Sequence, residues 1–164
     1  MRSKCLFAGM VLLLTLPGYA ATPDNTLAAQ ANDPATRQGM AALVRAQVLL
    51  DRAHFSPGEI DGRAGSNQRR AVRGYQQARK LKVTGELDEA TWTSLNQDAA
   101  PALVTYTLTA DDVGQPVASI PEDMMAQATL SSLAFESIEE ALGERFHISP
   151  ALLKALNPNA DFSK

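Results

Sequence analysis

The chain has 164 residues, 45% of them apolar, and its formal net charge at pH 7 is −3. This length allows one ordinary domain or two small ones with tails, and the apolar fraction suits a globular protein. The single cysteine is Cys5. Everything after it therefore lacks the residue needed for a disulfide, a thiolate nucleophile or a thiolate metal ligand.

The N-terminal segment has the anatomy of a secretory signal peptide. A positively charged start precedes a nearly unbroken apolar run from Cys5 to Leu16, which is too short to span a bilayer well as a permanent anchor. Small residues around Ala20 then offer a cleavage site. We predict that residues 1–20 are a signal peptide. The protein is then exported to the periplasm or cell envelope and keeps no stable membrane anchor.

The next segments predict a spacer and a first helix. Residues 21–32 are small and polar, which is typical of a flexible spacer. Asp33-Pro34 suits a helix start, because Asp can cap the helix and Pro fits its first position. Apolar residues at helical spacing, among them Leu43 and Leu50, predict an amphipathic helix from about Pro34 to Ala53.

The turn dipeptides Pro57-Gly58 and Asp61-Gly62 predict a loop from His54 to Gly65. A second helix is predicted after this loop, and a short third helix after the turn at Thr84-Gly85. Ser66 is expected to cap the second helix and Asp88 the short third one. Residues 33–97 are thus expected to form three helices around a small core of Leu43, Leu50, Phe55, Ile60, Val72, Tyr75, Leu81, Val83, Trp92 and Leu95. Such a unit is near the lower size limit for independent folding.

The C-terminal part predicts a strand and two helices. Residues 98–103 are rich in Ala and Pro and are predicted to be a linker. Apolar residues alternate with threonines from Val104 to Thr109, which favours a strand. After a long connection, the capping box Ser137-Ile138-Glu139-Glu140 starts one helix, Ser149-Pro150 starts another, and Asn157-Pro158 ends it.

Five short motifs follow one another between Ala46 and Leu95. They are Gln47; Ile60-Asp61-Gly62 with Gly65; Ala71-Val72 with Tyr75-Gln76; Val83-Thr84-Gly85; and Thr91-Trp92-Thr93-Ser94-Leu95. In order and spacing they resemble the peptidoglycan-binding module found on many cell-wall enzymes. Two positions depart from that pattern: Ala64 stands where an aromatic residue is common, and Gln68 stands where Thr is common.

The last segment carries a second resemblance. Arg145 to Ser149 and Leu152 to Pro158 resemble the helix pair of a LysM domain, a glycan-binding β-α-α-β fold. Val104 to Leu108 would be its first strand, and its last strand would lie beyond Lys164. The expected fold is therefore mainly α: a three-helix peptidoglycan-binding module at 33–97, followed by an incomplete α+β LysM-like unit at 104–164.

A signal peptide, a peptidoglycan-binding module and a LysM-like unit in this order resemble the N-terminal, non-catalytic half of a murein L,D-transpeptidase. In that family a following domain supplies a catalytic Cys and a His. Since no cysteine follows Cys5, we predict that this chain is not an enzyme. A truncated L,D-transpeptidase, with its catalytic domain beyond Lys164, is the alternative.

The candidate ligand-binding residues come from the loop and the second helix: Ile60, Asp61, Gly62, Arg63, Gly65, Arg70, Arg73 and Tyr75. Arg63, Arg70 and Arg73 lie in a stretch without acidic residues, and arginine holds carboxylates, such as those of peptidoglycan stem peptides, with paired hydrogen bonds. A solvated helix face, or docking onto the acidic C-terminal segment, explains them equally well. Asp61-Gly62 alternatively forms a structural turn, and Tyr75 alternatively packs in the core.

Other chemistries are not predicted. His54 and His147 are far apart in sequence and lack ligand partners at metal-site spacing. Glu139 and Glu140 are adjacent on a helix, so their carboxylates point to different faces. Lys154 is the only basic residue of the last helix, which argues against DNA reading, and the predicted export argues against nucleic acid as a partner. We expect no catalytic residue, metal or cofactor.

Two functions remain on this evidence. The first is non-catalytic binding of peptidoglycan, through its glycan or its stem peptide, which targets a cell-wall protein to the murein. Its affinity is expected to be modest, because a small surface offers few anchors. The second is a periplasmic adaptor that binds a protein partner through the acidic C-terminal segment.

Overall fold

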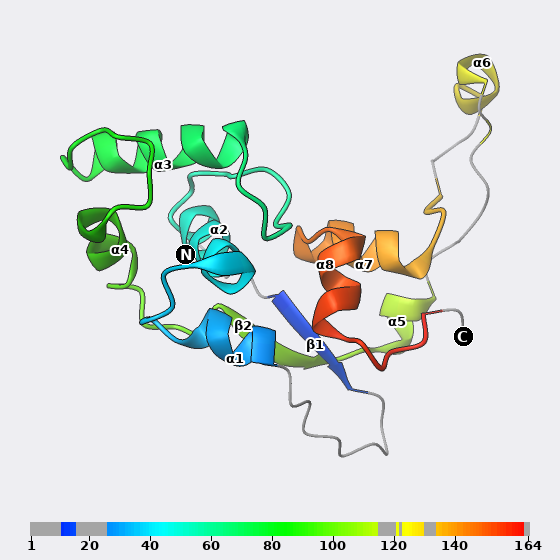
Figure 1. Cartoon of the computed structure of the whole chain (residues 1–164). Helices are drawn as coiled ribbons and strands as arrows, with labels where there is room; N and C mark the ends of the chain where they lie inside the picture. Colours follow the sequence, from blue (N-terminus) through cyan, green and yellow to red (C-terminus); the bar gives the residue numbers. More distant parts are fainter. Residues whose placement is uncertain (1–10, 16–25, 115–120, 122, 130–133, 163–164) are drawn as a thin grey trace, which may run out of the picture.

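A computed structural model describes residues 11–15, 26–114, 121, 123–129 and 134–162 of the chain. Over these residues the protein is mainly helical, as predicted. Its elements in chain order are β1 (Val11–Thr15), α1 (Thr26–Asn32), α2 (Gly39–Arg52), α3 (Ser66–Ala78), α4 (Glu89–Leu95), β2 (Leu103–Thr107), α5 (Ala110–Val113), α6 (Met124–Gln127), α7 (Ile138–Phe146) and α8 (Pro150–Leu156). Figure 1 shows α3 and α4 on one side of α2, and α7 and α8 on the other.

Helix α2 is the central element. It starts later than predicted, and it is buried on more sides than predicted. It begins at Gly39 rather than Pro34, because Gln38 is extended (φ −138°, ψ 160°) and Gly39 has a positive φ of 76°, so the turn after Asp33 does not continue into the helix. Nine of its fourteen residues are buried, including Arg45 and Gln47, while Leu43 is only half-buried. One apolar stripe was predicted, but neighbours surround the helix.

The predicted core of the three-helix module is largely confirmed. Leu50, Val72, Tyr75 and Leu95 pack together, with Phe55 and Leu81 partly buried beside them, and Trp92 packs on Ala42 and Ala46. Three predicted members lie outside this core: Val83 is 49% exposed, Leu43 is only half-buried, and Ile60 packs in the second core described below. The backbone next to Val83 turns toward the buried amide of Gln76, which fills the inner side of that loop and leaves the valine outside.

A second core joins the two halves of the chain. It contains residues of α1, α2, β2, α7 and α8, together with Ile60 and Ile148: Ala28, Ala31, Ala41, Val44, Val48, Ile60, Ala102, Leu103, Leu142, Ile148, Leu152, Leu153 and Leu156. The predicted flexible spacer at 21–32 is thus a helix from Thr26 onward, whose small alanines allow close contact with α2. The predicted linker at 98–103 ends in two fully buried residues.

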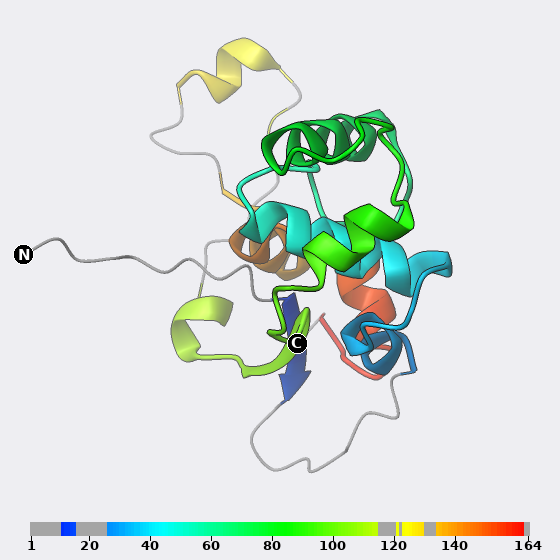
Figure 2. The same cartoon turned by 90° about the vertical axis from the view of Figure 1, so that its left-hand side faces the viewer.

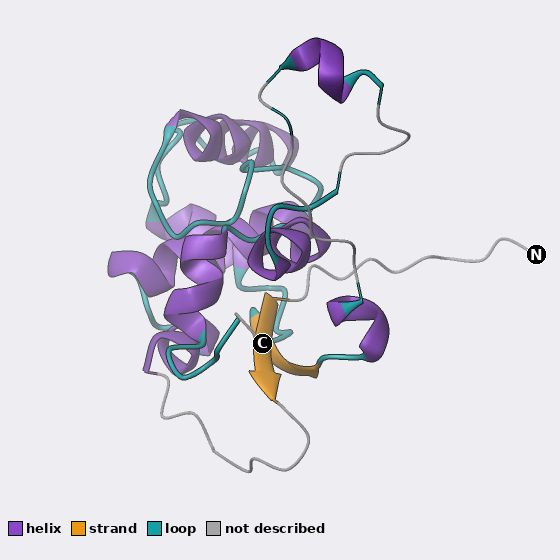
Figure 3. Cartoon of the chain, turned by 90° about the vertical axis from the view of Figure 1, so that its right-hand side faces the viewer, coloured by secondary structure: helices purple, strands orange, loops and turns teal. Residues whose placement is uncertain are grey.

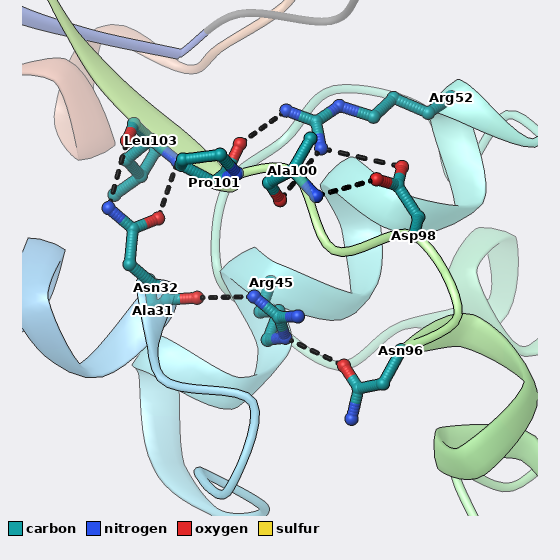
Figure 4. A network of polar contacts seen from close by, with 9 residues as sticks. All are labelled: Ala31, Asn32, Arg45, Arg52, Asn96, Asp98, Ala100, Pro101 and Leu103. Atoms are coloured by element: carbon teal, nitrogen blue, oxygen red, sulfur yellow. Dashed lines mark hydrogen bonds and ion pairs between the residues drawn. The ribbon is translucent and has the colours of Figure 1, made fainter.

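Polar side chains fix this connection (Figure 4). The Asn32 amide donates to the Leu103 carbonyl and accepts from the Leu103 amide, both at 2.8 Å. Arg45 donates to Asn96 (2.9 Å) and to the Ala31 carbonyl (3.3 Å), and burial, followed by the charge of Arg37, lowers its pKa. Arg52 reaches Asp98 and two carbonyls of the 98–103 segment. A stretch predicted to be a linker is therefore held along its length.

The two strands form a parallel pair, with Val11 opposite Leu103 and Thr15 opposite Thr107. Figure 3 shows them side by side. Strand β2 confirms the predicted strand, which begins one residue earlier than expected. The predicted signal peptide lies outside the described residues except for its central part, β1. Among the helices of the described residues, none is both long and apolar enough to cross a membrane.

Helices α7 and α8 begin where their sequences predict. Ser137 accepts a hydrogen bond from the Glu140 amide, and Ser149 accepts one from the Leu152 amide, both at 3.1 Å. The long connection before them contains α6, which stands apart from the rest of the chain in Figures 1 and 2 and exposes Met124 and Met125. The start of each helix is a local property, whereas their docking depends on residues far away in sequence.

Strand β2 and α7 meet at a buried carboxylate. Asp112 accepts hydrogen bonds from the Thr109 amide, the Thr109 hydroxyl and the Tyr106 hydroxyl, and its other oxygen forms an ion pair with Arg145. Burial raises the pKa of Asp112, but these hydrogen bonds and the arginine outweigh it, and the net shift is downward. The rings of Tyr106 and Phe146 add an edge-to-face contact with centroids 5.3 Å apart. Strand β2 thus packs against α7, although a long connection separates the two elements in the sequence.

Candidate functional site

The predicted binding loop is held from below by one buried glutamine of α2. The Gln47 amide oxygen accepts from the amides of Asp61 (3.2 Å) and Gly62 (2.8 Å). Its amide nitrogen donates to the Asp61 carboxylate (2.9 Å) and to the Arg63 carbonyl (3.1 Å). A single side chain thus satisfies both donors and acceptors of the turn that leads into α3.

A second glutamine, on α3, repeats this arrangement. The Gln76 amide oxygen accepts from the amides of Thr84 (2.9 Å) and Gly85 (2.8 Å). Its nitrogen donates to the hydroxyls of Thr84 (2.9 Å) and Thr91 (2.8 Å), and to the Glu86 carbonyl (3.0 Å). Each turn therefore joins two helices through a glutamine on the first of them.

Both turns require a glycine, Gly62 after Asp61 in the first turn and Gly85 after Thr84 in the second. Gly62 and Gly85 have φ values of +69° and +78°, a region that favours glycine. A Cβ at Gly62 would lie 2.8 Å from the Met40 side chain, and one at Gly85 would lie 2.7 Å from Arg73 Nε. The Asp-Gly and Thr-Gly pairs thus record close packing as well as turn chemistry. The sequence showed both glutamines but not what they hold.

Several predicted site residues serve the fold. Ile60 and Tyr75 are 1% and 2% exposed, so neither side chain faces solvent. The Tyr75 hydroxyl hydrogen-bonds to Ser94 (2.8 Å), and its ring packs edge-on against Phe55 at 5.6 Å. Asp61 also accepts from the Arg63 amide at 2.8 Å. The structural alternatives, a turn at Asp61 and core packing for Tyr75, therefore describe the positions of these side chains.

The remaining predicted residues, Arg63, Gly65, Arg70 and Arg73, are exposed. Helix α3 is amphipathic: its inner face buries Gln68, Ala71, Val72, Tyr75 and Gln76, and its outer face carries the arginines. Arg70 donates to Asn67 on the same face, and Arg73 packs over Gly85. The guanidinium groups thus have local supports and open access to solvent.

Among the described residues, no ion pair joins the arginines of α3 to the acidic C-terminal segment. Arg69 pairs with Glu86 (3.6 Å) and Arg52 with Asp98 (3.5 Å), while Arg145 and Lys154 pair within the C-terminal half. Arg69 and Glu86 are mostly exposed, so their pair contributes little to stability. The intramolecular alternative therefore does not describe the arrangement of these residues.

Two surface clefts lie away from these arginines. One, of about 510 Å³, lies between the 56–59 loop and the α7–α8 corner, and the other, of about 380 Å³, lies between α5 and α7. Neither is lined by Arg63, Arg70 or Arg73. In the part of the chain that the structure describes, no group of three or more His, Cys, Asp or Glu side chains is arranged to hold a metal ion.

The cap of α4 makes the second turn sensitive to pH. Hydrogen bonds from the Thr91 side chain, then from its amide, lower the pKa of Asp88, and Thr84 adds to this shift. A carboxyl group with a lowered folded-state pKa stabilises the fold above its unfolded pKa, and this contribution is lost as the pH falls through the folded value.

We therefore expect the stability advantage of the wild type over Asp88→Asn to shrink as the pH is lowered from about 7 to about 2, below the usual aspartate pKa. Asparagine keeps the cap acceptor but does not titrate. Urea unfolding of both proteins at several pH values measures the difference. A difference that is constant with pH would contradict this role for Asp88.

The comparisons with known proteins bear on the segment that contains both turns. Residues 40–95 match the family model described as "Putative peptidoglycan binding domain". The comparison with curated proteins found no match. The match runs from α2 through the end of α4 and includes both anchoring glutamines and the arginine face of α3. The segment 40–95 is thus similar to the peptidoglycan-binding domain family, which supports peptidoglycan binding in general and an association with the cell envelope.

Proposed function

We propose that this chain binds peptidoglycan without catalysis and holds a cell-wall protein against the murein. The observation that carries the proposal is the outer face of α3, within the matched segment. There Arg70 and Arg73 are exposed one helical turn apart, while the opposite face is buried in the module's core. Residues at this spacing lie on the same side of a helix, so both can contact one ligand.

The chemistry of these arginines suits the stem peptides of peptidoglycan. Those peptides carry carboxylates, and a guanidinium group binds a carboxylate through two parallel hydrogen bonds. Arg63 is an exposed residue of the loop that precedes α3, and it would extend the same contact surface. An exposed site of this kind binds weakly and is screened by salt, so retention on an insoluble polymer would depend on many sites acting together.

Removing both arginines is expected to weaken binding to peptidoglycan. The purified chain without residues 1–20 should co-sediment with insoluble sacculi. Arg70→Ala/Arg73→Ala should weaken that binding roughly tenfold, since two exposed ion pairs contribute on the order of 0.7 kcal/mol each and about 1.4 kcal/mol corresponds to a factor of ten. Lys82→Ala/Lys154→Ala removes the same charge elsewhere and serves as the matched control. Equal binding by the two double variants would rule out a specific role for the α3 face.

The proposal includes export with cleavage after Ala20, and the mass of the native protein in the envelope fraction tests this. A mass equal to residues 21–164 would support a wall-binding protein released from its signal peptide. A much larger mass would instead favour the targeting part of an enzyme with a further domain, of which an L,D-transpeptidase is the candidate. The predicted LysM-like unit is compatible both with a separate wall-binding protein and with the targeting part of an L,D-transpeptidase.

An adaptor function is the second candidate, and α6 favours it. This short helix stands apart from the other elements, and Met124 and Met125 are 79% and 76% exposed on it. Exposed methionines are common at surfaces that bind other proteins. Recovery of a stoichiometric protein partner by the exported chain, together with no co-sedimentation with sacculi, would favour the adaptor over the peptidoglycan-binding protein.

A further inference from the structure

The loop of the peptidoglycan-binding segment is hydrogen-bonded to the turn between α7 and α8. The Ile60 amide donates to the His147 carbonyl (2.9 Å), and the Ser149 amide donates to the Ile60 carbonyl (3.0 Å). These two bonds make an isolated parallel bridge between Ile60 and Ile148, whose residues are 1% and 0% exposed. Residues almost ninety positions apart thus share a strand-like contact, although the family match ends at Leu95.

The shape of the α7–α8 turn explains why it can pair in this way. His147 ends α7 in the left-handed region (φ 56°), which reverses the chain, and Ser149 is extended (φ −65°, ψ 143°) before α8. The Ile148 amide bonds back to the Gly143 carbonyl at 2.9 Å. A Cβ at Gly143 would lie 2.7 Å from the Ile148 oxygen, so glycine permits this close return. Local contacts thus shape the turn, and its His147 carbonyl and Ser149 amide are the groups that bond to Ile60.

The binding loop consequently has two anchors. Gln47 holds Asp61, Gly62 and Arg63 from α2, and the turn at 147–149 holds Ile60 immediately before them. If the turn were removed, both backbone groups of Ile60 would lose their partners in a buried place, which is unfavourable. The path of the chain into α3, and with it the position of Arg63, would then lose one of its two backbone anchors and keep the other, Gln47.

We propose that His147, Ile148 and Ser149 are positioning residues of the peptidoglycan-binding site. The functional unit then comprises the matched segment together with the C-terminal helix pair, and the helix pair raises affinity by holding the loop rather than by touching the ligand. The effect on affinity rests on the proposed function, whereas the effect on the loop does not.

Two substitutions at one position separate this role from simple capping. Ser149→Pro removes the amide that bonds to Ile60, and its backbone φ of −65° already suits proline. It also removes the hydroxyl that caps α8. Ser149→Ala removes the hydroxyl and keeps the amide, and is therefore the matched control. Any difference between the two variants reports on the bond to Ile60.

The experiment measures amide hydrogen exchange and co-sedimentation with sacculi for both variants lacking residues 1–20. We expect the amides of Ile60, Asp61 and Gly62 to exchange roughly tenfold faster in Ser149→Pro than in Ser149→Ala, which corresponds to the loss of one buried hydrogen bond. Sacculus binding should fall several-fold in parallel, with unchanged helix content. Equal exchange in the two variants would overturn the proposal.

The wild type supplies a further test that does not depend on the proline variant folding. If the turn positions the loop, the amides of Ile60 and Ser149 open in the same event and show equal protection. Much faster exchange at Ile60 than at Ser149 would overturn the proposal. If the wild type does not sediment with sacculi, the proposed function fails, and the exchange data still decide whether the turn holds the loop.

Discussion

Replacing Gln76 with alanine is expected to lower the free energy of unfolding by about 3 kcal/mol, because each lost buried hydrogen bond costs on the order of 1 kcal/mol and unpaired groups cost more. Gln76 is fully buried and makes five hydrogen bonds to the second turn and to α4. Its loss leaves the amides of Thr84 and Gly85 facing an empty space. Urea unfolding followed by circular dichroism measures the change.

The neighbouring residue provides the control. Gln77 lies on the same helix but is exposed, so Gln77→Ala is expected to change stability by less than about 0.5 kcal/mol. Gln76→Glu keeps the acceptor oxygen but places a buried carboxylate against the Glu86 carbonyl, so at pH 7 it should destabilise the protein at least as much as Gln76→Ala. Similar unfolding midpoints for Gln76→Ala and Gln77→Ala would show that the amide does not hold the turn.

Replacing Leu153 with alanine is expected to destabilise the whole chain by about 3 kcal/mol, within the usual range for a buried leucine. Leu153 is fully buried on α8, in the core that α8 shares with α1, α2 and β2. Because that core includes Ala41, Val44 and Val48 of α2, weakening it should destabilise the segment 40–95 as well. The halves should therefore unfold together.

The only tryptophan reports on this coupling. Trp92 lies on α4 and packs on α2 in a different cluster from Leu153. Its fluorescence should lose the folded signal at the same, lower urea concentration as the helical signal in Leu153→Ala. Lys154→Ala, next to it on the exposed face of α8, is the control. An unchanged Trp92 midpoint, with a shifted midpoint for the helical signal, would instead favour two independent domains.

Structural features that depend on contacts between residues close in the sequence could be predicted from the sequence alone. Asp88, Ser137 and Ser149 cap the helices that follow them, as predicted, because a cap needs only the amides two or three residues ahead. Most of the module's core followed from helical spacing. The start of α2 was predicted wrongly because the pattern Asp33-Pro34 is compatible with a helix, whereas Gln38 is extended and Gly39 takes a positive φ directly before the observed start.

The candidate site was only partly predictable for a related reason. The order of motifs between Gln47 and Leu95 indicated peptidoglycan binding, and the family match supports that general function. The motifs did not separate ligand contacts from supports, however. Ile60, Gly62 and Tyr75 turned out to be buried, while Gln47 and Gln76, named only as parts of a pattern, hold the two turns.

The mainly helical fold, the starts of α4, α7 and α8, and the resemblance of the central segment to a peptidoglycan-binding domain follow from the sequence. Ser66 was expected to cap α3, but it is the first residue of that helix and Gly65 precedes it without a side-chain cap. The tertiary structure was needed to show that α1 and residues 98–103 belong to the core, that α2 is buried on nearly all sides, and that Ile60 pairs with Ile148. Helix starts depend on backbone groups a few residues apart. Shared cores and bridges depend on contacts between distant residues, which no local pattern in one sequence records.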